Sequence, residues 1–306
     1  MRPSLVLTVG VAAISCAAVL VRLADAPPLA VAAYRMVIAS LVLLPLGLVR
    51  ARSEIATLLE REWRLLCLAG LFLALHFGLW IASLSYTTVA SSVVLVTATP
   101  IFVALASWVV FKERLRRATF AGIAISAVGA VLIGQVGWQY GGPAPTGNVL
   151  ALLAAVAMAG YLLVGRRLRR TAGLLAYSTV VFSIAAVMLL GAVLVSATPM
   201  AGYSGATYGV LIALALVPQL IGHVSLNWAL RFVSATMVTV AVLGEPVGAS
   251  VLAWLVLAET PAIAEIGGGI LMLFGIALAF LRGGLVPPRT LIDRQYNGTS
   301  GGRLRH

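Results

Sequence analysis

Glu245 is the residue of this sequence whose type and surroundings most directly indicate chemistry. It lies midway along an apolar run over residues 234–256, where a carboxylate is costly unless it meets water, a partner or a proton. Pro246 follows it, removes a backbone hydrogen bond and is expected to kink a helix, which frees a carbonyl group. Glu245 is therefore a candidate site for a substrate amine or a proton. The alternative is a structural carboxyl group bonded to a neighbouring helix.

Two histidines within apolar runs form a second candidate site. His76 and His223 can hydrogen-bond a substrate or relay a proton, and the alternative is that both are bonded within the fold. Two imidazoles without a third ligand make a weak metal site, so we expect no metal. Trp80 and Asn227 each lie one helical turn after a histidine and Tyr161 lies in a further run, so they add aromatic and amide groups to candidate cavity walls. Aromatic packing is the alternative for Trp80 and Tyr161.

Arg35 is a third candidate, because it lies in the early part of an apolar run over residues 30–49. A guanidinium group there can snorkel outward to water or pair with a carboxylate such as Asp25. It can also bind a substrate carboxylate through two parallel hydrogen bonds. The first two options make Arg35 structural, and the third makes it part of a binding site.

The segments that carry these residues are far more apolar than those of a soluble protein. Hydrophobic residues make up 61% of the 306-residue chain and charged residues 10%, against roughly 45–50% and about 25% in soluble domains. A run of about 20 apolar residues can cross the hydrocarbon core of a bilayer as a helix. We therefore expect an all-α polytopic membrane protein with ten transmembrane helices, over residues 4–23, 30–49, 64–84, 88–110, 118–137, 147–165, 174–195, 206–227, 234–256 and 262–281.

Basic residues are concentrated in alternate loops between these runs. One set of loops, together with the ends of the chain, holds almost all the Lys and Arg residues, whereas the opposite set has only Arg22. By the positive-inside rule both termini are cytoplasmic, which also requires an even number of spans. The net charge of +12 then suits lipid headgroups rather than nucleic acid. Residues 283–306 are polar, Gly-rich and basic, and we expect a disordered cytoplasmic tail.

The first and second halves of the chain also resemble each other in sequence. A shift that places Pro100 on Pro246 superposes further identical residues, namely Trp108 on Trp254, Glu113 on Glu259, Gly122 on Gly268 and Gly129 on Gly275. We therefore expect two five-helix repeats, over residues 1–137 and 146–282. Because five is odd, the second repeat must start on the opposite side of the membrane, and inverted repeats of this kind are common in secondary transporters.

The same shift gives counterparts to the residues around Glu245. Thr99 takes the place of Glu245, and Ser92 lies two turns earlier on the same helix face, so neutral hydroxyls are expected at the level of the carboxylate. Pro100 is expected to kink its span as Pro246 kinks the other. The paired glycines of the fifth and tenth runs allow close helix packing, either within the chain or in a homodimer.

Two segments carry a resemblance to a known family. These are TATPIFVALASWVVFKERL, from Thr97 to Leu115, and LGEPVGASVLAWLVLAE, from Leu243 to Glu259. In a ten-span chain they resemble the EamA branch of the drug/metabolite transporter superfamily, over roughly residues 4–282, and the aromatic amino-acid exporters are the branch that we expect. The resemblance implies a pathway between spans one to four and six to nine, with spans five and ten peripheral and a candidate dimer interface. Similar members export amino acids, other metabolites or drugs.

These observations predict a secondary transporter that exports a small organic solute by alternating access, across a cytoplasmic membrane that the Arg-rich, Lys-poor composition indicates is a bacterial inner membrane. One acid, two histidines, hydroxyls and aromatic groups suit amino acids, with aromatic and neutral ones favoured. A drug or cationic-metabolite exporter of the same fold is the alternative. An intramembrane enzyme is disfavoured because the sequence has no His-Glu-x-x-His pair. We expect no catalytic residue and no cofactor.

Overall fold

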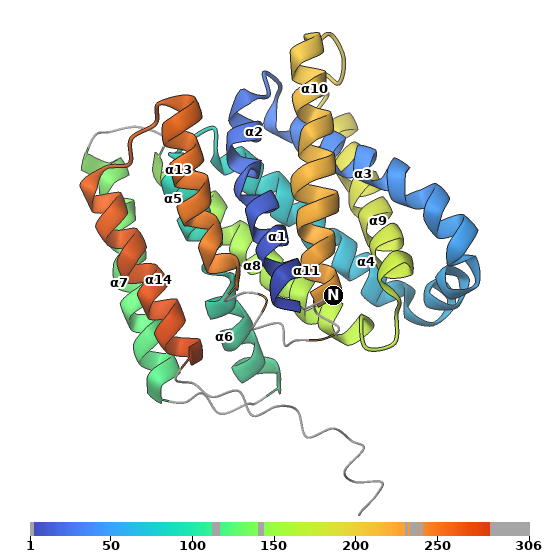
Figure 1. The fold of residues 1–306 in the computed structure, drawn as a ribbon, viewed down its shortest axis with the longest axis horizontal. Coiled ribbons are helices and arrows are strands. Elements are labelled where there is room, and N and C mark those ends of the chain that lie inside the picture. Colours follow the sequence, from blue (N-terminus) through green and yellow to red (C-terminus); the bar gives the residue numbers. More distant parts are fainter. Residues whose placement is uncertain are drawn as a thin grey trace, which may run out of the picture.

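The computed structural model describes residues 3–111, 117–139, 144–229, 232, 238 and 241–281. Throughout these residues every regular element is a helix and there is no strand, which confirms the all-α prediction. The predicted tail over residues 283–306, and Glu113 with its basic neighbours, lie outside the described residues. Figure 1 shows the helices packed side by side, with α7 and α14 together at one edge.

Among the described residues, seven helical stretches are long and apolar enough to cross a membrane. They are Ser4–Leu23, Pro28–Arg50, Arg52–Ser83, Val89–Ala106, Ala144–Leu168, Leu174–Val195 and Gly205–Ala229. Shorter apolar helices cover Arg117–Ile133, Val242–Leu257 and Ile263–Leu278. The polytopic character that the composition predicts is therefore confirmed, whereas the count of ten crossings stays a prediction.

The individual helices follow the apolar runs in order. They are α1 (Pro3–Ser15), α2 (Ala17–Leu23), α3 (Pro28–Arg50), α4 (Arg52–Ser83), α5 (Val89–Val96), α6 (Thr99–Phe111), α7 (Arg117–Gln139), α8 (Ala144–Leu168), α9 (Leu174–Val195), α10 (Gly205–Leu214), the π-helix η1 (Ala215–His223), α11 (Val224–Ala229), the 3₁₀-helix η2 (Val242–Gly244), α13 (Glu245–Leu257) and α14 (Ile263–Leu281). Helix α4 begins before the run predicted over residues 64–84, and its backbone leaves helical geometry at Glu62. Charged residues precede that kink, so the apolar run alone could not locate the start of the helix.

Four of the described stretches are interrupted within their apolar runs. The interruptions lie between α1 and α2, between α5 and α6, along η1, and at η2 before α13. At the first, Ser15 Oγ donates 2.9 Å to the carbonyl oxygen of Val11, a bond that bends helices. Within η1, Pro218 has no N–H to donate. These four stretches therefore present irregular backbone at mid-span.

The two prolines expected to kink helices instead stand near the beginnings of helices. Pro100 is the second residue of α6 and Pro246 is the second residue of α13. Proline fits the first turn because the backbone N–H that it lacks has no partner there anyway. Each proline thus marks where the second segment of an interrupted stretch starts.

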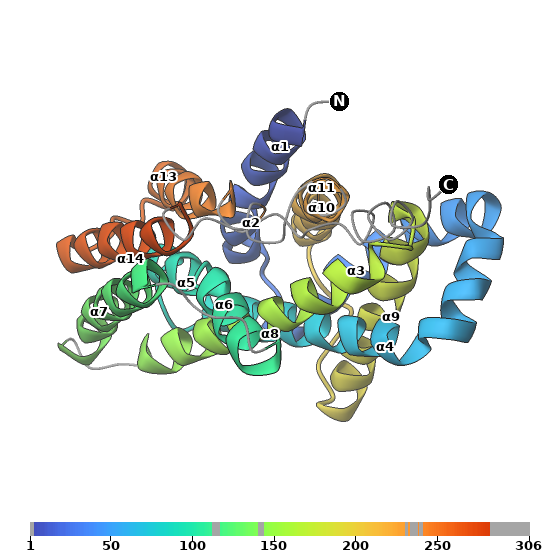
Figure 2. The same cartoon turned by 90° about the horizontal axis from the view of Figure 1, so that it is seen from below.

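The helix contacts between the two halves of the chain include pairs of corresponding runs and pairs that have a counterpart in which the two halves are swapped. Helix α3 packs on α9, α5 on α13, and α7 on α14, and each pair joins corresponding runs of the two halves. Helix α4 packs on α8, and the corresponding pair is η1 with α1. Figures 1 and 2 show the α7 and α14 pair at the edge of the bundle, with α13 and α5 between it and α1.

Small residues allow α7 and α14 to approach closely. A Cβ atom added at Gly129 would lie 2.6 Å from the carbonyl oxygen of Gly268, and one added at Gly275 would lie 2.5 Å from Ser126 Oγ. The Ser126 hydroxyl donates 3.1 Å to the carbonyl oxygen of Met272. The glycine faces are thus used within the chain, which is one of the two options the sequence left open, and a homodimer through these helices stays a prediction.

A polar cluster ties three segments together at the end of the bundle away from Pro3. We call it the Arg22 cluster, and it comprises Arg22, Thr88, Val89, Glu259 and Glu265. Arg22 Nη2 lies 3.5 Å from Glu259 Oε2, and Glu259 Oε1 accepts the backbone N–H of Val89 at 2.5 Å. Glu265 accepts a hydrogen bond from the Thr88 hydroxyl. The cluster joins the end of α2, the start of α5 and the α13–α14 connection.

Candidate binding cavity

A cavity lies where the interrupted stretches meet. All four interrupted stretches contribute to it, and α3, α4 and α8 close the remaining walls. Its lining residues are Ile14, Ala17, Arg35, His76, Trp80, Val96, Thr97, Thr99, Pro100, Met158, Leu162, His223, Leu226, Val238, Val242 and Glu245. A site built from discontinuous helices inside the membrane is typical of secondary transporters.

Arg35 enters the cavity from α3 as a buried cation. Its side chain is 0% exposed, its Nε–H donates 2.8 Å to Gln219 Oε1, and its Cζ lies 4.1 Å from the centre of the Phe77 ring. Nη1 and Nη2 have no hydrogen-bond partner in the described part of the chain. Two of the options for Arg35 are therefore wrong, because burial rules out snorkelling and the only ion pair among the described residues leaves Asp25 out.

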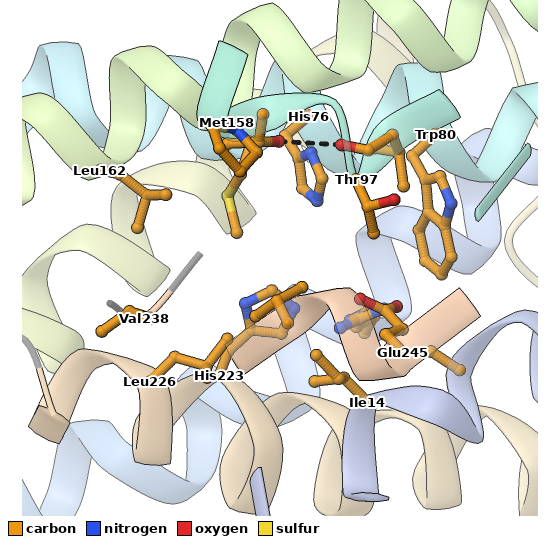
Figure 3. Close-up of a pocket in the computed structure, with 16 residues that line it drawn as sticks. Ile14, His76, Trp80, Thr97, Met158, Leu162, His223, Leu226, Val238 and Glu245 are labelled. Atoms are coloured by element: carbon orange, nitrogen blue, oxygen red, sulfur yellow. Dashed lines mark hydrogen bonds between the residues drawn. The ribbon is translucent and has the colours of Figure 1, made fainter. Parts of the chain in front are cut away.

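Glu245 reaches the same cavity from the start of α13. Figure 3 shows its carboxylate directed into the open space, facing the side of the cavity that carries Trp80 and His76. The carboxylate and the Arg35 guanidinium do not form an ion pair, and no described residue hydrogen-bonds the carboxylate. A guanidinium and a carboxylate thus face one cavity without neutralising each other by contact.

The two histidines lie between Glu245 and the apolar side of the cavity that carries Leu162, Leu226 and Val238 (Figure 3). His76 Nδ1 lies 3.0 Å from the carbonyl oxygen of Ala154, and because a carbonyl only accepts, Nδ1 must carry the hydrogen. The His76 ring stacks on Trp80 at an interplanar angle of 3°, and its centre is 6.4 Å from that of His223. The bond to Ala154 orients the His76 ring and leaves its Nε2 available to a bound solute.

The cavity has a polar end and an apolar end. Figure 3 shows Leu162, Leu226 and Val238 together on one side, and Trp80 and Glu245 on the opposite side. Met158 also lines the space. The arrangement suits a solute with a compact charged head and an apolar body.

The structure brings most of the predicted site residues together and leaves some outside. Those that line the cavity are Glu245, His76, His223, Trp80, Thr99, Arg35 and Pro100. Thr99 points its hydroxyl at the backbone, donating 2.9 Å to the carbonyl oxygen of Val96. Pro246 is buried beside Glu245 and does not line the cavity.

Ser92, Tyr161 and Asn227 are buried in contacts within the fold. Ser92 Oγ lies 2.6 Å from Ser83 Oγ, which joins α5 to α4. The Tyr161 hydroxyl donates 2.8 Å to Asn227 Oδ1, which joins α8 to α11. None of these three side chains lines the cavity. Their bonds satisfy both hydroxyls and Asn227 Oδ1, whereas Asn227 Nδ2 has no partner among the described residues.

Two residues beside Arg35 were missed by the sequence analysis. Gln219 and Phe77 are both fully buried, and both contact the Arg35 guanidinium. A glutamine inside an apolar run is itself a signal, because a buried amide is costly without a hydrogen bond. Phe77 carried no such signal, since phenylalanine is common in apolar runs.

Comparison with known proteins agrees with this architecture. The model of the EamA-like transporter family matches residues 3–135 and again residues 145–281. Over 221 residues, 69% of each chain, this protein is 26% identical to the uncharacterized transporter YdfC of Bacillus subtilis (strain 168). It is 23% identical over 246 residues, 78% of each chain, to an uncharacterized transporter of Clostridium kluyveri.

A solved crystal structure shares the fold. It is 20% identical in sequence, covers 93% of this chain and 99% of its own, and superposes with a TM-score of 0.66. The family model matches nearly all of the described chain, and both relatives are named as transporters. This multi-pass membrane protein therefore belongs to the EamA-like transporter family.

Proposed function

We propose that the protein is a secondary transporter that exports amino acids with apolar or aromatic side chains across a bacterial cytoplasmic membrane. One observation carries the proposal: Arg35 and Glu245 face the same buried cavity, and neither is neutralised by a contact with the other. A zwitterion supplies the missing partner of each charge at once. Its carboxylate can bind the guanidinium through parallel hydrogen bonds, and its ammonium group can bind the Glu245 carboxylate.

The rest of the cavity supports a bulky apolar side chain on that zwitterion. Trp80 offers a ring face beside the charged end, and its Nε1 is buried without a partner among the described residues. Met158 and Leu162 line the apolar end. Aromatic side chains gain most from such walls, because they bury large apolar areas and pack edge to face.

Alternating access is supported by the way the two halves correspond. The family model matches each half separately. The helix pairs also correspond, because α4 of the first half packs on α8 of the second as η1 of the second packs on α1 of the first. We assign the repeats to residues 1–137 and 146–282, inverted relative to each other. Two similar halves that swap conformations would turn a cavity open to one side into one open to the other.

A cationic drug or metabolite is the alternative cargo, and Glu245 is the observation in its favour. Arg35 weighs against it, because a cation bound at Glu245 would leave the buried guanidinium unpaired and would be repelled by it. An amino acid therefore supplies a carboxylate partner to Arg35, whereas a cationic drug does not.

Counterflow in liposomes tests the proposal. Proteoliposomes loaded with tryptophan, phenylalanine, threonine or a cationic dye would be assayed with and without a pH gradient, for the wild type and Glu245→Gln. We expect tryptophan and phenylalanine to exchange faster than threonine, and Glu245→Gln to abolish this exchange. Movement of the dye alone would overturn amino-acid export in favour of the drug exporter. Residual exchange in Glu245→Gln that no longer responds to the gradient would identify Glu245 as a proton-coupling group as well.

A further inference from the structure

We propose that Gln219 is a positioning residue that holds Arg35 for end-on, bidentate binding of a carboxylate group on the cargo. The inference rests on the proposed function and specifies which group the cationic side of the cavity recognises. It predicts that a free carboxylate is required for high affinity, and that this requirement depends on a residue that does not itself line the cavity.

Gln219 is bonded to Arg35 in one defined orientation. It lies on η1 and is 0% exposed, and its Oε1 accepts the Arg35 Nε–H at 2.8 Å. An arginine nitrogen only donates, so the amide oxygen must face Arg35. Gln219 Nε2 has no partner in the described part of the chain. The bond to Arg35 is therefore the one side-chain hydrogen bond that orients this amide among the described residues.

Phe77 fixes the plane of the same guanidinium from another helix. The Arg35 Cζ lies 4.1 Å from the centre of the Phe77 ring, a distance typical of cation–π stacking. Arg35 comes from α3, Phe77 from α4 and Gln219 from η1, and α3 packs on both of the other elements. Three segments therefore hold one planar cation, which reduces the entropy lost when a ligand binds it.

The bond to Gln219 selects which edge of the guanidinium remains for a ligand. A carboxylate can bind arginine side-on, through Nε and one terminal nitrogen, or end-on, through both terminal nitrogens. Gln219 occupies Nε, which excludes the side-on mode. Nη1 and Nη2 are both buried and unpartnered among the described residues, and Arg35 lines the cavity. A planar group with two oxygens matches this edge, whereas an amine does not.

The π-helix contributes by setting the direction of Gln219. Residue 219 lies in the middle of η1, directly after Pro218. A π segment turns less per residue than an α-helix, so residue 219 faces a different direction from the one it would have in a regular helix. Single π turns are frequent at functional sites, and here the widened turn places an amide against Arg35.

The test uses the full chain in liposomes with tryptophan, tryptamine and indole-3-propionate as probes. Tryptamine lacks the carboxylate and indole-3-propionate lacks the amine. Gln219→Glu keeps the side-chain shape but places a negative charge beside the Arg35 guanidinium, where it competes with the cargo carboxylate. We therefore expect the half-saturating tryptophan concentration to rise about tenfold or more, with little change in the maximal rate. Gln219→Leu should give a smaller rise. Ser40→Ala is the matched control, because Ser40 is a buried, unpartnered polar residue of α3 that does not line the cavity.

Two results would overturn the inference. One is an unchanged half-saturating tryptophan concentration in folded Gln219→Glu and Gln219→Leu, and the other is wild-type transport of tryptamine as efficient as that of tryptophan. If the Gln219 variants do not fold, Arg35→Lys decides, since its single ammonium should lose the thermal stabilisation that indole-3-propionate gives the wild type. Retained stabilisation would contradict the inference. Binding of indole-3-propionate without movement of any amino acid would refute amino-acid export while leaving the carboxylate site intact.

Discussion

The Arg22 cluster and the cavity contain the same kinds of charged group in opposite states. Arg22 is 33% exposed and paired with Glu259, and it also donates 2.9 Å to the carbonyl oxygen of Thr87. Arg35 is fully buried, and only its Nε is hydrogen-bonded among the described residues. Removing an ion from water costs several kcal/mol unless bonds replace the water. The charges of the Arg22 cluster are thus hydrogen-bonded within the fold, whereas Arg35 keeps two unpartnered nitrogens at the site where we propose that a solute binds.

Replacement of Arg35 should give the largest effect on transport and one of the smallest on stability. We expect Arg35→Met to lower tryptophan counterflow about 100-fold, since a buried charged hydrogen-bond partner contributes on the order of 3 kcal/mol. The unfolding free energy should change by less than about 1 kcal/mol, because removal of an incompletely bonded buried charge offsets the loss of the bond to the Gln219 amide. Counterflow and thermal unfolding in the same detergent check both parts. Strong destabilisation would show that Arg35 is a structural cation, and the contrast with Arg22 would fail.

Removal of Glu265 should give the largest stability effect in the Arg22 cluster. Glu265 is 5% exposed and accepts hydrogen bonds from the Ser91 hydroxyl at 2.5 Å and the Ala262 N–H at 2.8 Å, as well as from Thr88. We expect Glu265→Ala to lower the unfolding free energy by about 2–3 kcal/mol, because buried donors lose their acceptor. Glu265→Gln is the control, since it keeps one acceptor oxygen. A changed half-saturating tryptophan concentration would contradict the separation of the cluster from the cavity.

Glu259 should contribute less, and its two roles can be separated. Its Oε1 accepts the first N–H of α5 and its Oε2 pairs with Arg22. Glu259→Gln keeps an acceptor for the N–H and loses the charge, whereas Glu259→Ala loses both. We expect a loss of about 1 kcal/mol in the alanine variant, the usual contribution of a helix cap. Thermal unfolding should rank the glutamine variant between alanine and wild type, and equal losses would show that the charge dominates.

Arg22 should give the smallest effect. Its pair with Glu259 is partly exposed, and such pairs contribute about 0–1 kcal/mol. We expect Arg22→Gln to shift the thermal midpoint only slightly, and 0.5 M salt to reduce the difference from wild type further, since salt screens exposed charges within about one Debye length. A large, salt-insensitive loss would show that the pair of Arg22 and Glu259 contributes as a buried ion pair does.

Much of the helical framework was predictable from the sequence, because apolar runs and their polar breaks follow directly from the solvent that each part of the chain must face. The candidate residues were predictable by type, since a charged or imidazole side chain in an apolar run needs a reason. The contacts that each of these residues makes could not be predicted from the sequence. Tyr161 and Asn227 have the chemistry of site residues, yet they bond to each other, and nothing in the sequence distinguishes that outcome from a cavity wall.

Interrupted helices explain the remaining errors. Ser92 was placed on the face of Thr99 by regular helical spacing, but the chain leaves the helix between α5 and α6, so that spacing does not hold. The π turn that directs Gln219 toward Arg35 is equally invisible to periodicity. Helices that are apolar on all sides also give no amphipathic stripe from which to infer a facing direction.

The interruption of two stretches at the cavity has a consequence for its electrostatic potential. Helix α6 begins at Thr99 and α13 begins at Glu245, and both residues line the cavity. A helix carries roughly half a positive charge at its first turn, but at α13 the Glu245 N–H is already bonded to the carbonyl oxygen of Val242 in η2. The first turn of α6 therefore adds to the field of Arg35, so the cavity attracts an anion more strongly than its one arginine implies. Glu245, in the first turn of α13, places its negative charge where that helix favours one.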